Sequence, residues 1–455
     1  MALTTVFSAC LASSCANRAK QSISFYEAGD YAGAERAADD GLKEHPDDRG
    51  LWGMRVRAAL ALGNGDDVAK SYAALREHEG DDDKPLLHDL AQATIEQALD
   101  SPSAKLKIRA IETIVALDMA DLEQAIANLL GDRDDRVAAA ASIAVLHDDP
   151  RAPQVADAML VSESGEARRI AVDGVGRKVG KLALGDLEKA GEDPDPRVRE
   201  VAVRWLGKLK DAEAVVLCTQ RLHDQDDAVR AAAAEALGAI GIGDLAADAK
   251  VALADHALEV RLAGVDLLAA AHRDDLLAAL VDDPDPRIAL AAGLAAPRES
   301  GALAKAIARA VAAPDWTTRV AAAGALAHGL PAAQALTAAR QLAADKVVAV
   351  RLAAARALVA LGDAADARAV FAAALHDPDH GIQAAADLAA QGDPAGVAAL
   401  SEAVRDAARS PEQRAEAATA HVAAHRVTPG LVAALADSNA LVRIEAAAAL
   451  GELAK

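Results

Sequence analysis

The chain has 455 residues, three cysteines and a formal net charge of −21, and 53% of its residues are hydrophobic although only 2% are aromatic. Alanine accounts for the difference at roughly a quarter of the chain, and because alanine is the strongest helix former, the composition predicts an all-α protein. The negative charge repels phosphate backbones, and neither a basic stripe nor a set of aromatic rings offsets it, so the sequence argues against nucleic-acid binding.

Residues 1–16 differ in composition from the rest of the chain. Residues 2–9 are apolar or small, and small residues lead into Cys10 and again into Cys15. This segment resembles the end of a bacterial lipoprotein signal, in which small residues precede a lipid-modified cysteine. The resemblance implies a lipid anchor at Cys10 or Cys15 in a bacterial cell envelope, and the alternative is a disordered tail on a cytoplasmic protein. No other segment has the ~18 uninterrupted apolar residues of a membrane span.

Residues 17–80 follow a pattern of their own. The segment 25–48 resembles a tetratricopeptide repeat. The matching positions are Gly29, Asp30, Tyr31, Ala34 and Pro46, and Trp52 stands where the next repeat would place its tryptophan. We therefore predict a helical cap over 17–80, followed by a linker or helix over 81–100. Most aromatic residues lie in this cap, where we expect them to pack in its core in preference to lining a peptide-binding groove.

From about residue 100 a pattern recurs about every 28–32 residues, within the range of helical-repeat proteins. It consists of Asp, a short turn, and then Val-Arg-x-x-Ala-x-x-x-Leu-Gly. The clearest copies lie at 193–209, 226–240, 256–270, 315–327, 347–362 and 437–453. The apolar spacing after each turn predicts a helix with one buried face, and a second apolar segment predicts a second helix. Glycines such as Gly207 and Gly362 are expected to end the first helix.

A single pair of these helices cannot be stable alone. Ordering about 30 residues costs roughly 45 kcal/mol, and offsetting this cost needs ~1,800 Å² of apolar burial. A helix pair built largely of alanine buries too little surface, whereas contact with neighbours on both sides supplies enough. We therefore expect the repeats over 101–455 to stack into a continuous α-solenoid.

The repeating unit resembles the short HEAT-like repeat, of the type also found in phycobilisome lyases. The resemblance implies a right-handed α-solenoid of about twelve helix pairs, in which aspartates and arginines form a ladder of contacts between adjacent repeats. It assigns that structural role to Arg109, Arg168, Arg199, Arg230, Arg261, Arg319, Arg351, Arg414 and Arg443. The copies at Val137 and Ile288 carry alanine instead, and the copy at Ile382 carries Gln383, so we expect a weaker ladder there.

Few residues form a recognisable catalytic or metal-binding pattern. His421 and His425 have the spacing that can put two imidazoles on one helix face, but no third ligand accompanies them, so polar residues near a helix end are the preferred interpretation. The turn 376–380 holds two histidines and two aspartates, for which helix capping is preferred. Cys218 lies on an apolar helix face and is expected to be a small buried hydrophobe. The sequence thus predicts no enzyme, no metal and no cofactor.

The expected function is that of a monomeric scaffold that presents an extended concave surface to a protein partner. In HEAT-like arrays the helix with the Val-Arg pair lines the concave side, which puts the residue five positions after each arginine on one ridge. The ridge residues are Asp173, Arg204, Glu235, Asp266 and Arg356. A solvated charged face explains them equally well. The alternatives are a lyase or chaperone for a bilin or another tetrapyrrole, by resemblance to the phycobilisome lyases, and a HEAT-like nucleic-acid-binding protein.

Overall fold

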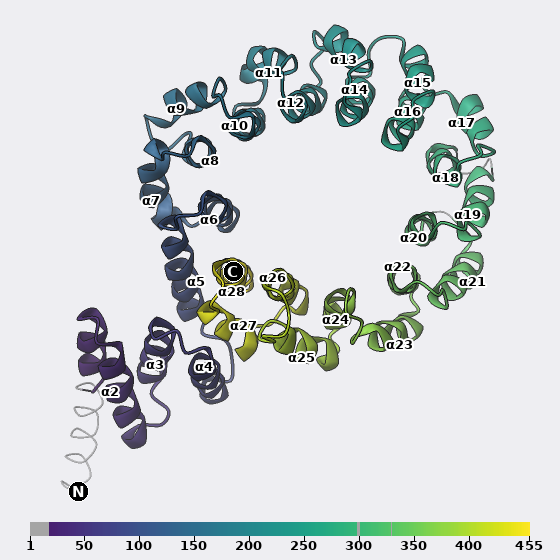
Figure 1. The fold of residues 1–455 in the computed structure, drawn as a ribbon. Helices are drawn as coiled ribbons and strands as arrows, with labels where there is room; N and C mark the ends of the chain where they lie inside the picture. Colours follow the sequence, from purple (N-terminus) through teal and green to yellow (C-terminus); the bar gives the residue numbers. More distant parts are fainter. Residues whose placement is uncertain (1–17, 298–300, 329) are drawn as a thin grey trace, which may run out of the picture. The chain divides into compact units, whose positions relative to one another are not determined.

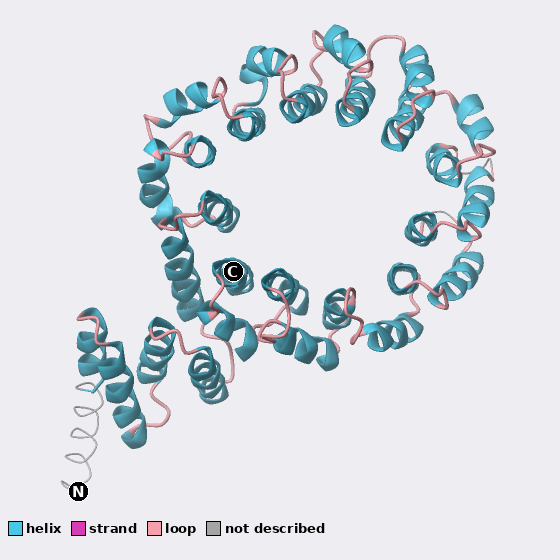
Figure 2. Cartoon of the chain, in the orientation of Figure 1, coloured by secondary structure: helices cyan, strands magenta, loops and turns pink. Residues whose placement is uncertain are grey.

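A computed structural model describes residues 18–297, 301–328 and 330–455. Over these residues the backbone is helical, contains no β-strand, and is joined by short turns (Figure 2). Consecutive helices pack as pairs on their neighbours, which confirms the predicted α-solenoid. No helix in this part of the chain is both long enough and apolar enough to cross a membrane. The candidate anchor residues Cys10 and Cys15 lie outside the described residues.

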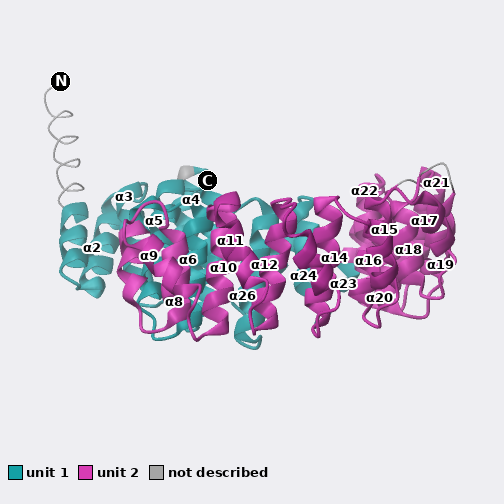
Figure 3. Cartoon of the chain, turned by 90° about the horizontal axis from the view of Figure 1, so that it is seen from above, with its two compact units in different colours: residues 1–122, 372–455 teal, residues 123–371 magenta. Residues whose placement is uncertain are grey.

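The chain divides into two compact units (Figure 3). Unit 1 combines residues 1–122 with residues 372–455, and unit 2 consists of residues 123–371. Unit 1 therefore contains both the N-terminal helices and the last repeats. The borders of these units do not coincide with the predicted divisions at residues 16, 80 and 100.

The helices of unit 1 come from two stretches of the chain (Figure 1). Residues 18–27 are helical. The first stretch continues with α2 (Tyr31–Glu44), α3 (Arg49–Ala61), α4 (Gly65–Glu79), α5 (Lys84–Leu99), α6 (Ala104–Leu117) and the 3₁₀ turn η1 (Ala120–Leu122). The second contains α24 (Gly381–Ala390), α25 (Pro394–Ala403), α26 (Pro411–Ala420), η5 (His421–Ala424), α27 (Pro429–Ala433), η6 (Ala434–Ala436) and α28 (Ala440–Ala454).

Unit 2 is a series of helix pairs over the residues that the structure describes. It contains α7 (Glu123–Ala127), η2 (Asn128–Gly131), α8 (Asp135–Ala144), α9 (Ala152–Met159), α10 (Gly165–Lys178), η3 (Gly180–Ala183), α11 (Leu184–Ala190), α12 (Pro196–Lys208), α13 (Val215–Arg221), α14 (Asp227–Ile240), α15 (Leu245–Leu253), α16 (Leu258–Ala270), α17 (Asp274–Leu280), α18 (Pro286–Ala295), α19 (Ala302–Val311), α20 (Trp316–Ala325), α21 (Ala332–Ala343) and α22 (Val348–Ala360). The border between the units falls within α23 (Ala364–Ala374).

Side chains in each inter-repeat turn determine where the following helix begins. Asp195 is the N-cap of α12 and accepts a hydrogen bond from the backbone N–H of Arg197 at 2.9 Å, while Pro196 occupies the first turn. Two residues before the N-cap, Asp193 accepts the backbone N–H of Asp195 at 2.8 Å. We call the residue at this second position the turn residue. Turn residues that make the same bond include Ser101, Ser162, Asp224, Asp255, Asp345 and Asp437.

The alanine-rich core depends on close helix approach. Gly207 lies inside α12, which continues to Lys208, so the prediction that Gly207 ends its helix is wrong. A Cβ atom at Gly207 would lie 2.6 Å from the Cα of Ala236 on α14. Gly362, in contrast, follows α22 with φ of +87°, a left-handed conformation that suits a glycine after a helix end.

The last helix of unit 1 packs on two helices from the start of the repeat array. α28 lies against α5 and α6 (Figure 1). Arg109 of α6 donates two hydrogen bonds to the Glu445 carboxylate of α28, at 2.6 and 2.7 Å. Gly451 allows α28 to approach α6 closely, since a Cβ atom there would lie 2.5 Å from Leu117. The first and last repeats are therefore direct neighbours.

The predicted N-terminal cap also contacts the end of the chain. Helix α4 packs on α27, and Arg76 donates a hydrogen bond to the backbone carbonyl of Val427 at 2.9 Å. Within this cap, the aromatic side chain of Tyr72 is fully buried, and its hydroxyl group donates a hydrogen bond to Asp82 at 2.6 Å. Tyr72 therefore serves as a core residue. The tetratricopeptide-like character of this region stays a prediction.

Candidate functional site

The arginines of the repeat pattern share one geometry in α10, α12, α14, α20 and α26. Nη1 of each donates to a backbone carbonyl of the turn before its own helix, as Arg199 does to Asp193 at 2.8 Å. Nε and Nη2 then hold both oxygens of the turn residue of the next repeat. These ladder pairs are Arg168–Asp193, Arg199–Asp224, Arg230–Asp255, Arg319–Asp345 and Arg414–Asp437. All of these Nε and Nη2 distances lie between 2.7 and 3.0 Å, which is the bidentate geometry favoured by a guanidinium and a carboxylate.

Three interfaces lack both members of the ladder pair. Ala138 of α8 stands at the arginine position, and the next turn residue is Ser162. Ala289 of α18 is followed in the same way by Ala313, and Gln383 of α24 is followed by Ala408. A partly buried arginine without its carboxylate would be costly, so the loss of both groups together is far less harmful than the loss of one.

The remaining predicted ladder arginines depart from this pattern. Arg261 makes a single bond of 3.2 Å to Asp285. Arg351 donates to the carbonyls of Asp345 and Lys346, as a ladder arginine does within its own turn. Arg109 does not fit the predicted role, because it lies two residues beyond the ladder position of α6, which Lys107 occupies. It pairs with Glu445, a partner that the repeat pattern does not indicate.

The ladder predicts a loss of stability in acid. Hydrogen bonds from Arg230 hold the pKa of Asp255 below its ordinary value, and those from Arg319 do the same for Asp345. Such groups stabilise the fold above their unfolded pKa of about 3.9, and the contribution is lost as pH falls through the folded pKa. We expect the urea midpoint, followed by circular dichroism, to fall as pH decreases below about 4. The fall should be smaller in an Arg230→Ala/Asp255→Ser variant, and an equal fall in both proteins would contradict the assignment.

Four of the five predicted ridge residues lie on alternate helices of unit 2, the first helix of each of four successive pairs. Asp173, Arg204, Glu235 and Asp266 come from α10, α12, α14 and α16, and we call them the charged ridge. Asp173 accepts a hydrogen bond from the indole N–H of Trp205 at 2.9 Å. Arg204 pairs with Glu200 at 2.8 Å and approaches Glu235 to 3.6 Å. Arg356 lies apart on α22, because Leu294 and Gly324 occupy the equivalent positions of α18 and α20.

Glu235 and Asp266 bring two negative charges together at one end of the charged ridge. Both side chains reach the surface. Burial against the neighbouring helices is the larger cause that raises the pKa of Asp266, and the negative charge of the Glu235 carboxylate is the second. Arg204 lies on the Glu235 side of this pair, so the Asp266 end is the more strongly negative.

The histidine pair of the sequence does not form a metal site. His421 is fully buried, and its Nδ1 and Nε2 lie 2.7 Å from the Ala417 carbonyl and 3.1 Å from the Thr428 hydroxyl. Burial lowers its pKa, and both contacts fit a neutral ring that donates from Nδ1. His425 is exposed in a left-handed conformation after η5. Among the described residues no group of three or more His, Cys, Asp or Glu side chains is arranged to hold a metal ion.

Cys218 of α13 has the environment of a core residue. It is fully buried, and this burial, with a smaller effect of Asp211, raises its pKa to about 12. A cysteine with that pKa stays protonated and is a poor nucleophile near pH 7.

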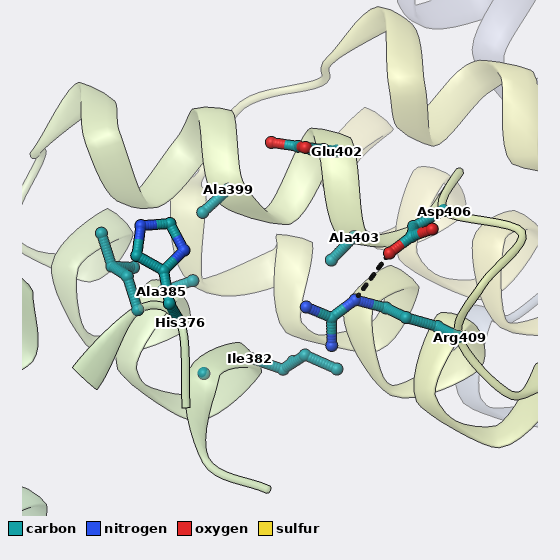
Figure 4. A pocket seen from close by; sticks show the side chains of 10 residues that line it. His376, Ile382, Ala385, Ala399, Glu402, Ala403, Asp406 and Arg409 are labelled. Carbon is teal, nitrogen blue, oxygen red and sulfur yellow. Dashed lines mark ion pairs between the residues drawn. The ribbon is translucent and has the colours of Figure 1, made fainter. Parts of the chain in front are cut away.

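A cavity of about 110 Å³ lies among α24, α25 and the turn before α26 (Figure 4). Asp406 and Arg409 pair at 3.5 Å on one side of the cavity, and His376 faces it from the turn that follows α23. The cavity has room for a few water molecules. His380 instead contacts Asp377 at 3.1 Å in its own turn, so the predicted cluster of residues 376–380 is divided between the cavity and a helix start.

Comparison with known proteins supports the repeat architecture. A family model described as HEAT repeats matches residues 184–269 and 303–390, which cover α11 to α16 and α19 to α24 except for one end residue each of α16 and α19. No curated protein matches the chain.

The solved structures that resemble this one include the CpcE–CpcF complex of phycocyanin lyase from Nostoc (22% identity, 51% of this chain, 91% of that chain, TM-score 0.31), human deoxyhypusine hydroxylase (24%, 66%, 96%, 0.25) and the muscle myosin chaperone UNC-45 (13%, 93%, 67%, 0.33). At these identities and TM-scores the likeness carries no conclusion about function.

Proposed function

We propose that this chain, a HEAT-like repeat protein, acts as a non-enzymatic scaffold that binds a protein partner through the charged ridge of α10, α12, α14 and α16. Repeat proteins of this type offer extended surfaces to other proteins, because the stacking contacts occupy one side of each helix and leave another side free. The proposal concerns unit 2, where each ridge helix packs on the next ridge helix.

The acidic pair Glu235 and Asp266 is the observation that carries this proposal. The two carboxylates come from adjacent helices, both reach solvent, and the Glu235 carboxylate disfavours the charged form of Asp266. A lysine or arginine of a partner placed between them would relieve this repulsion. The expected partner surface is therefore basic at this point, which also favours fast association with a protein of net charge −21.

The neighbouring ridge residues are already held in place. The Trp205 indole fixes Asp173, and Glu200 holds Arg204. Lys208 lies over the Trp205 ring with its ammonium 4.5 Å from the ring centre. Because these side chains lose little freedom on binding, they can contribute to affinity at a lower entropic cost than mobile lysines or glutamates.

A charge-reversal experiment tests the proposal. The full chain and a Glu235→Lys/Asp266→Lys variant are used as baits for affinity capture from the native organism, and bound proteins are quantified by mass spectrometry. We expect a partner of the original protein to be reduced about tenfold or more with the variant, since like charges then face each other. The control is Asp186→Lys/Glu213→Lys, which makes the same change in net charge at exposed positions outside the ridge helices. Equal capture by all three proteins would reject the charged ridge as the binding surface.

A further inference from the structure

The contact between α28 and α6 in unit 1 continues the stacking of the repeats. Arg443 occupies the ladder position of α28, and Lys107 occupies that of α6. Glu445 and Arg109 each lie two residues further along, and they are joined by bonds of 2.6 and 2.7 Å. The two helices are thus aligned as neighbouring repeats are, so the turn before α6 occupies the place of the next turn for Arg443.

The Arg443 side chain makes the same hydrogen bonds to its own turn as the arginines of the ladder pairs make to theirs. Its Nη1 donates to the carbonyls of Asp437 and Ser438, at 2.7 and 3.2 Å. Arg199 uses its Nη1 identically, with the carbonyls of Asp193 and Pro194 at 2.8 and 3.2 Å. In Arg199 this arrangement leaves Nε and Nη2 for Asp224. The corresponding edge of Arg443 has no carboxylate within ion-pair distance among the residues that the structure describes.

The turn residue opposite Arg443 is Ser101. Its hydroxyl accepts the backbone N–H of Ser103 at 3.2 Å, so the turn keeps its shape without an aspartate. A cavity of about 300 Å³ lies between the two elements, lined by Gln97, Asp100, Ser101, Arg443 and Ile444 among others. Where serine or alanine replaces the turn residue elsewhere, at Ser162, Ala313 and Ala408, the facing arginine is also missing. Here the arginine is retained and faces a cavity.

We propose that this cavity binds a carboxylate from outside the chain, held by Nε and Nη2 of Arg443 in place of the missing turn aspartate. We call it the carboxylate slot. The planar edge of the guanidinium matches the two oxygens of a carboxylate. Asp100 lies in the lining and opposes a ligand of higher charge such as a phosphate, which makes a single carboxylate the best-matched group. The slot is formed by residues of unit 1 and the charged ridge by residues of unit 2, so each proposal can fail without the other.

Two probes distinguish the sources of such a carboxylate. One is the peptide acetyl-Asp-Pro-Asp-Pro-amide, which copies the natural turn 193–196, and the other is sodium acetate. Binding is followed by the 15N–1H signal of the arginine Nε–H groups in the full chain, with the Arg443 signal identified by its loss in Arg443→Lys. We expect the Arg443 signal to shift to saturation. Tighter binding of the peptide indicates a protein segment as the ligand, and equal binding of acetate indicates a small carboxylic acid. The peptide acetyl-Asn-Pro-Asn-Pro-amide should cause no shift.

A variant that refills the slot gives the decisive control. Ser101→Asp restores the missing turn aspartate, so it should raise the thermal midpoint of the chain and weaken binding of both probes about tenfold or more. Ser101→Asn has nearly the same volume without the charge and should bind the probes as the original protein does. No shift of the Arg443 signal with either carboxylate, or undiminished binding by Ser101→Asp, would overturn the proposal.

Discussion

Asp255→Ser is expected to lower the free energy of unfolding by about 3–5 kcal/mol, because it leaves Arg230 partly buried without its carboxylate. The Arg230 and Asp255 side chains are only 8% and 12% exposed, so water cannot replace the lost partner fully. Serine is the appropriate replacement, since Ser101 and Ser162 show that its hydroxyl can accept the backbone N–H of the turn. The effect therefore reports the loss of the charge pair and leaves the turn intact.

The double variant Arg230→Ala/Asp255→Ser should be considerably more stable than Asp255→Ser alone. It reproduces the combination of Ala138 and Ser162 that already occurs between α8 and α10. A double-mutant cycle with Arg230→Ala, measured by urea unfolding and by hydrogen exchange across α14 and α16, should give a coupling energy larger than the destabilisation caused by Arg230→Ala alone. Additive effects of the two substitutions would contradict the idea that the pair is gained and lost as a unit.

Gly207→Ala is expected to destabilise the chain by about 1–3 kcal/mol, although alanine is the better helix former. The new methyl group would lie 2.6 Å from Cα and 2.8 Å from Cβ of Ala236, and this contact involves the backbone of α14, which cannot rotate away. The two helices would have to separate. The thermal midpoint and the urea midpoint of the full chain measure the change.

Gly238→Ala is the matched control, because Gly238 has the same position relative to Arg230 as Gly207 has to Arg199. A Cβ atom there meets Leu267 at 3.8 Å and Ala270 at 3.9 Å, which are ordinary contact distances. The substitution should therefore stabilise the chain by about 0.5–1 kcal/mol through helix propensity. If both substitutions changed the stability in the same direction, interhelical distance would not determine the choice between glycine and alanine in this core.

The helix-pair architecture was predictable from the sequence because its determinants are local. The turn aspartates, the apolar spacing and the recurring arginine all lie within one repeat of about 30 residues. The resemblance to HEAT-like repeats also suggested that arginine and aspartate meet, and the structure places five arginines in bidentate pairs. The joint loss of both members at Ala138 and Ser162 can be seen in the sequence once the pairing is known.

Arg109 illustrates why local patterns mislead at the edge of a repeat array. Ile108 and Arg109 look like the Val-Arg pair of the repeat pattern. In the structure, however, Leu106 and Lys107 occupy the positions of that pair relative to the start of α6. The buried Ala110 confirms this register, because it corresponds to the alanine of the pattern. The partner of Arg109 is Glu445, 336 residues away, and no periodicity could indicate it. The cavity at Arg443 could not be predicted for the same reason.

The assembly of unit 1 from both ends of the chain has a consequence for synthesis on the ribosome. Arg109 and Glu445 are separated by 336 residues, and at typical rates of translation the second emerges on the order of tens of seconds after the first. During this delay α5 and α6 lack α28, so the face that will contact it stays open to solvent. The repeats of unit 2 need only their neighbours and can fold as they appear. Unit 1 thus completes its core last. Until α28 has been made, the N-terminal helices are the part of a new chain that most needs protection from aggregation.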